Sequence, residues 1–63
     1  MKGIISKEKT FVMNGPSPGS DIYDIINKGS KVIISNDNNI WYEVNIDGGK
    51  KYIRKKNVML IKN

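Results

Sequence analysis

Turn-forming residues divide this sequence into short apolar segments, and that spacing limits the folds open to it. The apolar residues are mainly Ile, Val, Tyr, Phe and Trp, which suit a pleated, half-buried surface better than a helix. The first clear segment is 10–13, and the loop that follows at 14–20 holds two Gly, two Pro and two Ser. Short β-strands joined by turns account for this pattern.

The second half of the chain predicts a hairpin with two distinct faces. Residues 40–46 alternate, so that one face carries Ile40, Tyr42, Val44 and Ile46 and the other carries Trp41, Glu43 and Asn45. Residues 47–49 are Asp-Gly-Gly, and glycine readily adopts the positive φ that a tight hairpin turn needs. Residues 50–54 are then expected to pair back as the next strand.

The remaining segments complete an all-β fold. We expect strands at 31–35 and 58–61, a tight polar turn at 36–39, another turn at 27–30, and either a helical turn or a strand at 22–26. Val32 and Ile34 share one face of their strand. About five short antiparallel strands in a single domain predict a small barrel or sandwich.

Length and composition exclude several functional classes. At 63 residues the chain makes one domain at most, and such a domain buries only about 60% of the surface its unfolded chain exposes. A deep substrate cleft is therefore not expected. The chain has no Cys and no His, which removes disulfides, thiolate metal sites and the Ser-His-Asp and Cys-His mechanisms. We expect a protein that is not an enzyme and that binds no cofactor or metal.

Four aspartates could be taken for a catalytic or calcium site, but turn chemistry explains them. Asp21 lies near Asp24, while Asp37 and Asp47 fall in separate turns. Paired carboxylates can hydrolyse glycosides, yet Asp in a turn commonly bonds its own backbone. The segment 37–39 also lacks the Gly and the later Glu of a calcium loop.

The net charge of +5 is concentrated in one segment. That basic patch consists of Lys50, Lys51, Arg54, Lys55 and Lys56. The rest of the chain has six basic residues against six acidic ones and is therefore neutral. For any single lysine, a solvated edge strand that discourages further pairing is the competing explanation.

An ordered set of short motifs runs from about residue 10 to residue 61. Its members are Val12, Gly15-Pro16-Ser17, Ile22, Ile25, Lys28-Gly29, Val32, Trp41-Tyr42-Glu43-Val44, Asp47-Gly48, Tyr52-Ile53 and Leu60. This order resembles the bacterial SH3-type domain family, which implies a small SH3-like barrel with a binding function. Many members of that family target lysins and autolysins to bacterial cell walls, while others belong to intracellular or membrane proteins.

The chain departs from the family pattern at three positions. Met13 and Asn14 stand where the family usually has Arg and Ser, which alters the polar chemistry beside the loop. Lys51 stands where a Gly usually precedes the aromatic residue, which puts a charged side chain beside the groove that the family implies.

Trp41 is the leading candidate for ligand contact. By alternation it points away from the apolar face of its strand. An outward Trp can stack on a peptide, a sugar or a base; the alternative is that Trp41 covers the loop at 16–18 as a lid on the core. The expected groove lies between loop 14–20, Trp41 and Tyr52.

The other candidates combine aromatic rings with cations. In a regular strand Tyr52 shares its face with Lys50, Arg54 and Lys56, which suits an anionic or carboxylate-bearing ligand. Tyr23 is expected to serve the core with its hydroxyl at the surface, or alternatively to line the groove. The candidate ligand-binding residues are Asn14, Tyr23, Trp41, Tyr52 and Arg54.

Three functions follow, in order of preference. The first is a binding module that recognises bacterial cell-wall peptide or glycan and targets a linked protein, with the basic patch attracting anionic wall polymers. The second is an intracellular adaptor that docks a segment of another protein. The third is a basic barrel that binds nucleic acid, and it ranks below the others because the remaining surface is neutral.

The sequence also bears on location. No apolar run approaches the roughly 18 residues of a membrane helix, so no membrane span is expected. The apolar segment at the start of the sequence is too short for a signal peptide. We therefore expect a cell-wall or extracellular site as part of a larger or phage-encoded protein, or a cytoplasmic one if residue 1 is the natural start.

Overall fold

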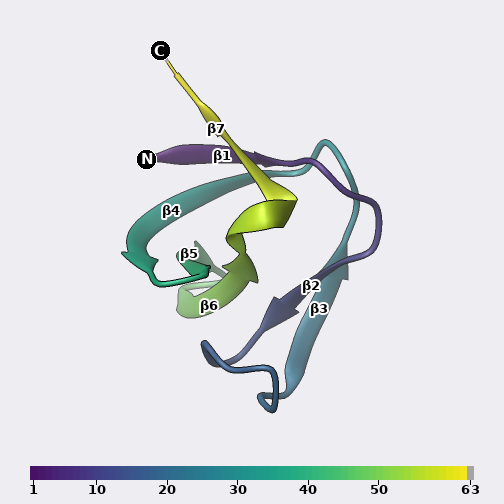
Figure 1. Ribbon diagram of the computed structural model, residues 1–63, viewed down its shortest axis with the longest axis vertical. Coiled ribbons are helices and arrows are strands. Elements are labelled where there is room, and N and C mark those ends of the chain that lie inside the picture. The colour runs from purple at the N-terminus through teal and green to yellow at the C-terminus, as the bar shows by residue number, and fades with distance from the viewer. Residues whose placement is uncertain (63) are drawn as a thin grey trace.

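The computed structural model describes residues 1–62 and shows an all-β protein (Figure 1). The strands are β1 (Lys2–Ile5), β2 (Thr10–Met13), β3 (Ile22–Ile26), β4 (Lys31–Asn38), β5 (Trp41–Ile46), β6 (Gly49–Arg54) and β7 (Val58–Ile61), with one 3-10 turn, η1 (Lys55–Asn57). They form one sheet in the order β3-β2-β6-β5-β4-β1-β7, and all neighbouring strands are antiparallel. No helix in the described part of the chain is long and apolar enough to span a membrane.

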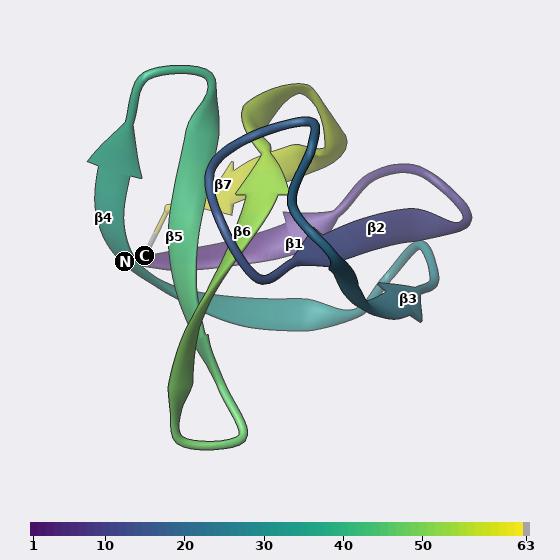
Figure 2. The same ribbon diagram turned by 90° about the horizontal axis from the view of Figure 1, so that it is seen from below.

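The sheet curls around one small core (Figures 1 and 2). Strand β4 is central to this curvature, because its first half pairs with β1 and its second half with β5. A β-bulge leaves Ser35 as an extra residue between the pairs formed by Ile34 and Asn36, and bulges bend the strand that carries them. The core consists of Ile5, Val12, Val32, Ile34, Val44 and Ile53, each no more than 6% exposed.

The hairpin of β5 and β6 forms as the sequence predicts. Its two-residue loop is Asp47-Gly48, with φ values of 53° and 76°. Two positive φ angles are the signature of the type I′ turn, whose twist matches that of the flanking strands. The turn sets a register with Ile46 opposite Gly49 at one end and Trp41 opposite Arg54 at the other. Val44 is fully buried on the predicted inner face.

The described sheet has seven strands where the sequence predicts about five. Segment 22–26, which was compatible with a helical turn or a strand, is strand β3. Strand β1 was not expected, since its length and composition give little local signal. It forms because it lies between β4 and β7, two strands far from it in sequence. Gly3 is buried there, and a Cβ at this position would come within 2.6 Å of Val58 Cγ1.

The predicted turn at 36–39 is also wrong in extent. Strand β4 continues to Asn38, and the turn consists of Asn39, with φ 60°, and Ile40. The polar residues stay extended because they pair with β5, with Asn36 opposite Glu43. Their side chains are exposed, so a strand accommodates them without burying polar groups. Ile40 thus leaves the strand in which alternation had placed it.

Candidate binding groove on the outer face of the sheet

The register of β2, β5 and β6 brings three of the candidate residues, Trp41, Tyr52 and Arg54, to the face opposite the core. In the pairing of β5 with β6, Trp41 lies opposite Arg54 and Glu43 lies opposite Tyr52. In the pairing of β2 with β6, Met13 lies opposite Tyr52. Residues opposite each other on antiparallel strands project to the same side. The intervening residues, among them Val12, Val44 and Ile53, are fully buried on the core side.

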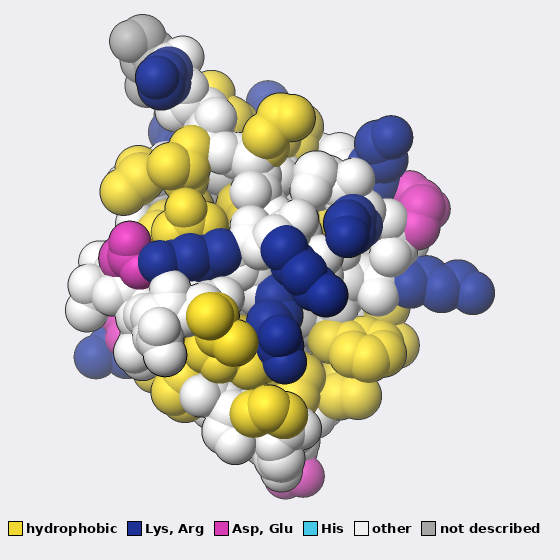
Figure 3. Space-filling model, viewed as in Figure 1, with side chains coloured by type: hydrophobic (Ala, Val, Ile, Leu, Met, Phe, Trp, Pro, Cys, Tyr) yellow, Lys and Arg dark blue, Asp and Glu magenta, His cyan; other side chains and the backbone are white. Residues whose placement is uncertain are grey.

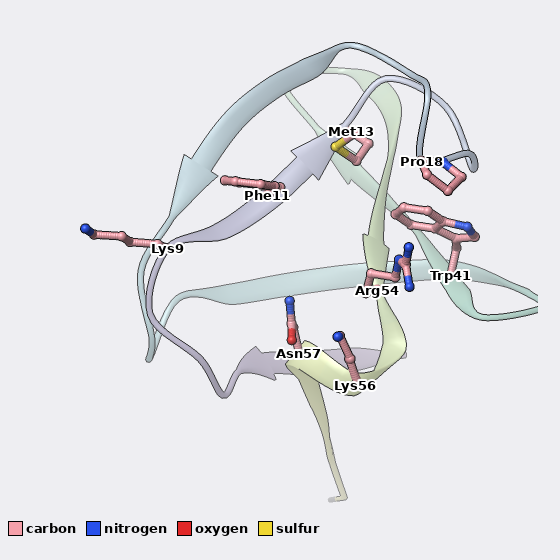
Figure 4. A pocket seen from close by; sticks show the side chains of 8 residues that line it. All are labelled: Lys9, Phe11, Met13, Pro18, Trp41, Arg54, Lys56 and Asn57. Atoms are coloured by element: carbon pink, nitrogen blue, oxygen red, sulfur yellow. The ribbon is translucent and has the colours of Figure 1, made fainter.

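A groove of about 370 Å³ opens on this outer face (Figure 4). It is lined by Lys9, Phe11, Met13, Pro18, Trp41, Arg54, Lys56 and Asn57. Its volume is at the lower end of the roughly 300–1,000 Å³ that is usual for ligand sites. Phe11 lies at one side of the groove and Trp41 at the other, with Arg54, Lys56 and Asn57 along a third side.

The loop at 14–20 is folded so that Pro18 lies against Trp41. The Ser20 hydroxyl oxygen lies 2.9 Å from the Gly15 carbonyl oxygen and 2.7 Å from the Ser17 carbonyl oxygen, and its one proton is shared between these two acceptors. These hydrogen bonds hold the loop in a compact turn that brings Pro18 over the indole ring (Figure 4). The small, polar composition of the loop therefore gives it a defined shape.

Trp41 forms one wall of the groove but is only 6% exposed. Pro18 lies on one side of its ring, and the Arg54 guanidinium carbon lies 4.8 Å from the ring centroid, within the range of a cation–π contact. Trp41 thus points away from the core, as alternation predicts, and also supports the loop. A ligand in the groove would meet an edge of the indole rather than a free face.

All polar side chains at the groove can donate hydrogen bonds, and none of its eight described lining residues is acidic. Lys9, Arg54 and Lys56 carry positive charge and only donate. The side-chain oxygen of Asn57 is buried without a hydrogen-bond partner among residues 1–62, and its amide nitrogen points into the space between Phe11 and Arg54 (Figure 4). The groove is therefore suited to a group that accepts hydrogen bonds and carries negative charge.

Two of the predicted ligand-binding residues lie beside the groove and do not line it. Asn14 is exposed at the start of the loop, where its backbone N–H donates to the Asp21 carbonyl at 2.9 Å. Tyr52 is half-buried, and its hydroxyl lies 3.5 Å from Glu43 Oε1. The Ser35 hydroxyl also donates to Glu43 Oε2 at 2.8 Å, so this carboxylate orders the neighbouring surface.

Tyr23 lies outside the core, contrary to expectation, and does not line the groove. It is the extra residue of a β-bulge in the edge strand β3, and its side chain is 39% exposed. Its hydroxyl donates to the Asp47 carboxylate, and the Lys51 ammonium lies 4.5 Å from its ring centroid. The hydrogen bond to Asp47 raises the pKa of Tyr23 above its ordinary value, with smaller contributions from desolvation and from the negative charges of Asp47 and Asp24.

The basic patch is not one surface. Lys50 and Lys51 lie next to the hairpin turn, whereas Arg54 and Lys56 lie at the groove. Arg54 lies four residues along the strand from Lys50, a distance of about 13 Å. Lys55 forms an ion pair with Asp37, and its ammonium lies 5.4 Å from the Tyr42 ring centroid. The basic residues of the patch without an ion-pair partner among residues 1–62 therefore lie near opposite ends of β6.

Several lining residues were missed by the sequence prediction. Phe11 and Met13 flank the buried Val12, so alternation alone marks them as outward, but nothing local shows that β2 pairs with β6. Lys9 and Asn57 follow no recognisable motif. Their place in the groove depends on the path of the chain into β2 and out of η1.

The aspartates do not form a cluster with metal-ligand geometry in the described part of the chain. Asp24 Oδ1 accepts a hydrogen bond from the adjacent Ile25 N–H at 2.8 Å, although Asp24 lies in strand β3 and not in the turn that the sequence predicts. Asp37 and Asp47 contact Lys55 and Tyr23, respectively.

Comparison with known proteins adds no assignment. No protein-family model matches the sequence, and no curated protein is similar enough to count as a relative.

Proposed function

We propose that this chain is a non-catalytic binding module that recognises bacterial cell-wall peptide or glycan and targets a linked protein. In this proposal the curled sheet is a variant of the SH3-like barrel, with β1 and β3 added to the five strands that the motifs suggest. The order of motifs from residue 10 to residue 61 supports the relationship. The site of action would be the bacterial wall, reached as part of a larger or phage-encoded protein.

The observation that carries the proposal is the groove itself. Phe11 and Met13 supply an apolar side, and Arg54 and Lys56 supply charge beside it. A shallow groove of this kind suits a flexible, extended ligand that is partly apolar and partly anionic. A single copy should bind weakly, so stable targeting would depend on repeated copies or on a linked domain.

Nucleic acid fits this surface less well. Backbone recognition needs cations spaced along a continuous track, whereas here Lys55 is paired with Asp37 and Lys50 lies about 13 Å along the strand from Arg54. A docked segment of another protein would use the same groove, and the wall-binding experiment separates that alternative from the preferred one.

The first test is co-sedimentation of the purified protein with washed Gram-positive cell walls, with and without their teichoic acids. We expect binding to survive removal of the teichoic acids and to be lost in Phe11→Ala. The matched control is Ile33→Ala, because Ile33 is 51% exposed and Phe11 49%, yet Ile33 does not line the groove. Both variants should keep the wild-type circular dichroism spectrum.

Two outcomes would contradict the proposal. Binding lost on removal of the teichoic acids would assign the interaction to charge alone. Absence of binding to either preparation would favour a protein segment as the ligand.

A further inference from the structure

Arg54 and Lys56 at the groove have no carboxylate partner among residues 1–62, so both are available to an anionic group of a ligand. The one ion pair among residues 1–62 joins Lys55 to Asp37. No carboxylate of the described chain therefore neutralises Arg54 or Lys56, although both line the groove. Figure 3 shows Lys and Arg side chains gathered in the middle of this face, over β6 and η1, with hydrophobic side chains on either side.

Arg54 is held in a fixed position for such an anion. Its guanidinium lies on the Trp41 ring, so part of the conformational entropy of this long side chain is already lost in the free protein. The planar fork of a guanidinium matches the two oxygens of a carboxylate. Asn57 adds a third donor, because its buried oxygen leaves the amide nitrogen directed into the groove.

Arg54 and Lys56 have a hollow on either side, and these hollows indicate which chemical groups would lie next to the bound anionic group. One is the groove with Phe11 and Met13, and the other is a hollow of about 330 Å³ lined by Asn39, Ile40, Arg54, Lys55 and Lys56. Arg54 and Lys56 thus form a ridge between two partly apolar depressions. Apolar side chains next to a carboxylate are typical of a peptide, whereas a glycan offers hydroxyl groups in their place.

We propose that the ligand of this groove is a peptide that carries a carboxylate, bound between Arg54, Lys56 and the amide nitrogen of Asn57. Its neighbouring side chains occupy the hollows on either side of the ridge. The inference rests on the proposed binding function of the groove and specifies the chemistry that it recognises. The carboxylate comes either from the carboxy terminus of the peptide or from an acidic side chain.

The test uses the single Trp of the chain as a fluorescent reporter, since Trp41 lies in the groove wall. Four peptides with a blocked amino terminus are titrated. Two are Leu-Ala-Leu, with a free or an amidated carboxy terminus. The other two are Leu-Ala-Glu-Ala-Leu and its Gln analogue, each with the carboxy terminus amidated. We expect at least one carboxylate peptide to bind about tenfold more tightly than its neutral partner, as charge-assisted hydrogen bonds are about twice as strong as neutral ones. The pair that shows the difference identifies the source of the carboxylate.

Two variants assign the effect to the ridge. Lys56→Gln removes an exposed charge at the groove. It should weaken binding of the carboxylate peptide several-fold and leave binding of the neutral analogue unchanged. Lys50→Gln makes the same change on an exposed residue that does not line the groove, and should have no effect. Asn57→Asp replaces the amide donor by a negative charge and should abolish the preference for the carboxylate.

The inference is overturned if neutral and carboxylate peptides bind equally, if none of the four peptides binds, or if Lys50→Gln weakens binding as much as Lys56→Gln. Wall co-sedimentation, measured in parallel, separates this failure from that of the proposed function. Wall binding without carboxylate preference refutes only the inferred ligand chemistry. Carboxylate-dependent peptide binding without wall binding refutes the wall function and leaves the inference intact.

Discussion

The close approach of β1 to β7 can be tested by giving Gly3 a side chain. A Cβ at Gly3 would lie 2.6 Å from Val58 Cγ1 and 3.0 Å from Ile34 Cδ1. Overpacking of this kind costs about 1–3 kcal/mol, and Val58 is β-branched, so its χ1 angle has little freedom to relieve the contact. Alanine also lowers the conformational entropy of the unfolded chain, which stabilises the folded state by about 0.4–1 kcal/mol and offsets part of this cost. Gly3→Ala should therefore lower the free energy of unfolding by roughly 1–2 kcal/mol.

A double-mutant cycle identifies the contact responsible. Val58→Ala removes the clashing methyl, so Gly3→Ala should cost less in that background, with a coupling of about 0.5–2 kcal/mol. Thermal and urea unfolding followed by circular dichroism measure the effects, and in a domain of this size 1 kcal/mol shifts Tm by about 4–8 °C. Gly19→Ala is the control, because the atom nearest to its added Cβ lies 3.8 Å away. Strict additivity of Gly3→Ala and Val58→Ala would refute the packing of β1 against β7.

Three further predictions concern single positions. Gly48→Ala should destabilise the fold by about 1–2 kcal/mol in urea unfolding, since φ 76° is left-handed backbone that a Cβ disfavours; an unchanged midpoint would contradict the type I′ turn. Asp47→Asn should lower the pKa of Tyr23 toward its ordinary value of 10.0, measured by ultraviolet absorbance during alkaline titration, because the carboxylate that raises this pKa is removed; an unaltered titration would contradict the hydrogen bond. Lys55→Gln should change stability by less than about 1 kcal/mol, since its partner Asp37 is 61% exposed and such surface pairs contribute little; a larger loss would indicate that Lys55 supports the Tyr42 ring.

Local signals in the sequence predict the hairpin of β5 and β6 well. Asp47-Gly48 specifies the turn, and alternation separates the buried Val44 from Glu43 and Trp41 on the opposite face. Both signals act over a few residues and need no knowledge of the rest of the chain. The same holds for Val32 and Ile34, which are buried on one face of β4 as expected.

The candidate site was predicted only in part. Trp41 and Arg54 line the groove because they are opposite each other in the predictable hairpin. Tyr52 shares that face but contacts Glu43, and Tyr23 is displaced by a bulge that no sequence pattern marks. The basic residues, treated as one patch in the sequence, fall into two groups. Lys50 and Lys51 lie at the start of the extended strand β6, whereas Arg54 and Lys56 lie at and beyond its end.

The sequence by itself determined that this chain is built of short antiparallel strands, where its best hairpin turns, and which side chains of that hairpin face the core. These properties depend on turn geometry and on the two-residue period of a strand. Only the tertiary structure decided that β1 pairs with β4 and β7, that β2 lies beside β6, and that Phe11 therefore shares a groove with Trp41. Such pairings join distant segments, and their choice depends on how the whole chain packs its core, which no local pattern encodes.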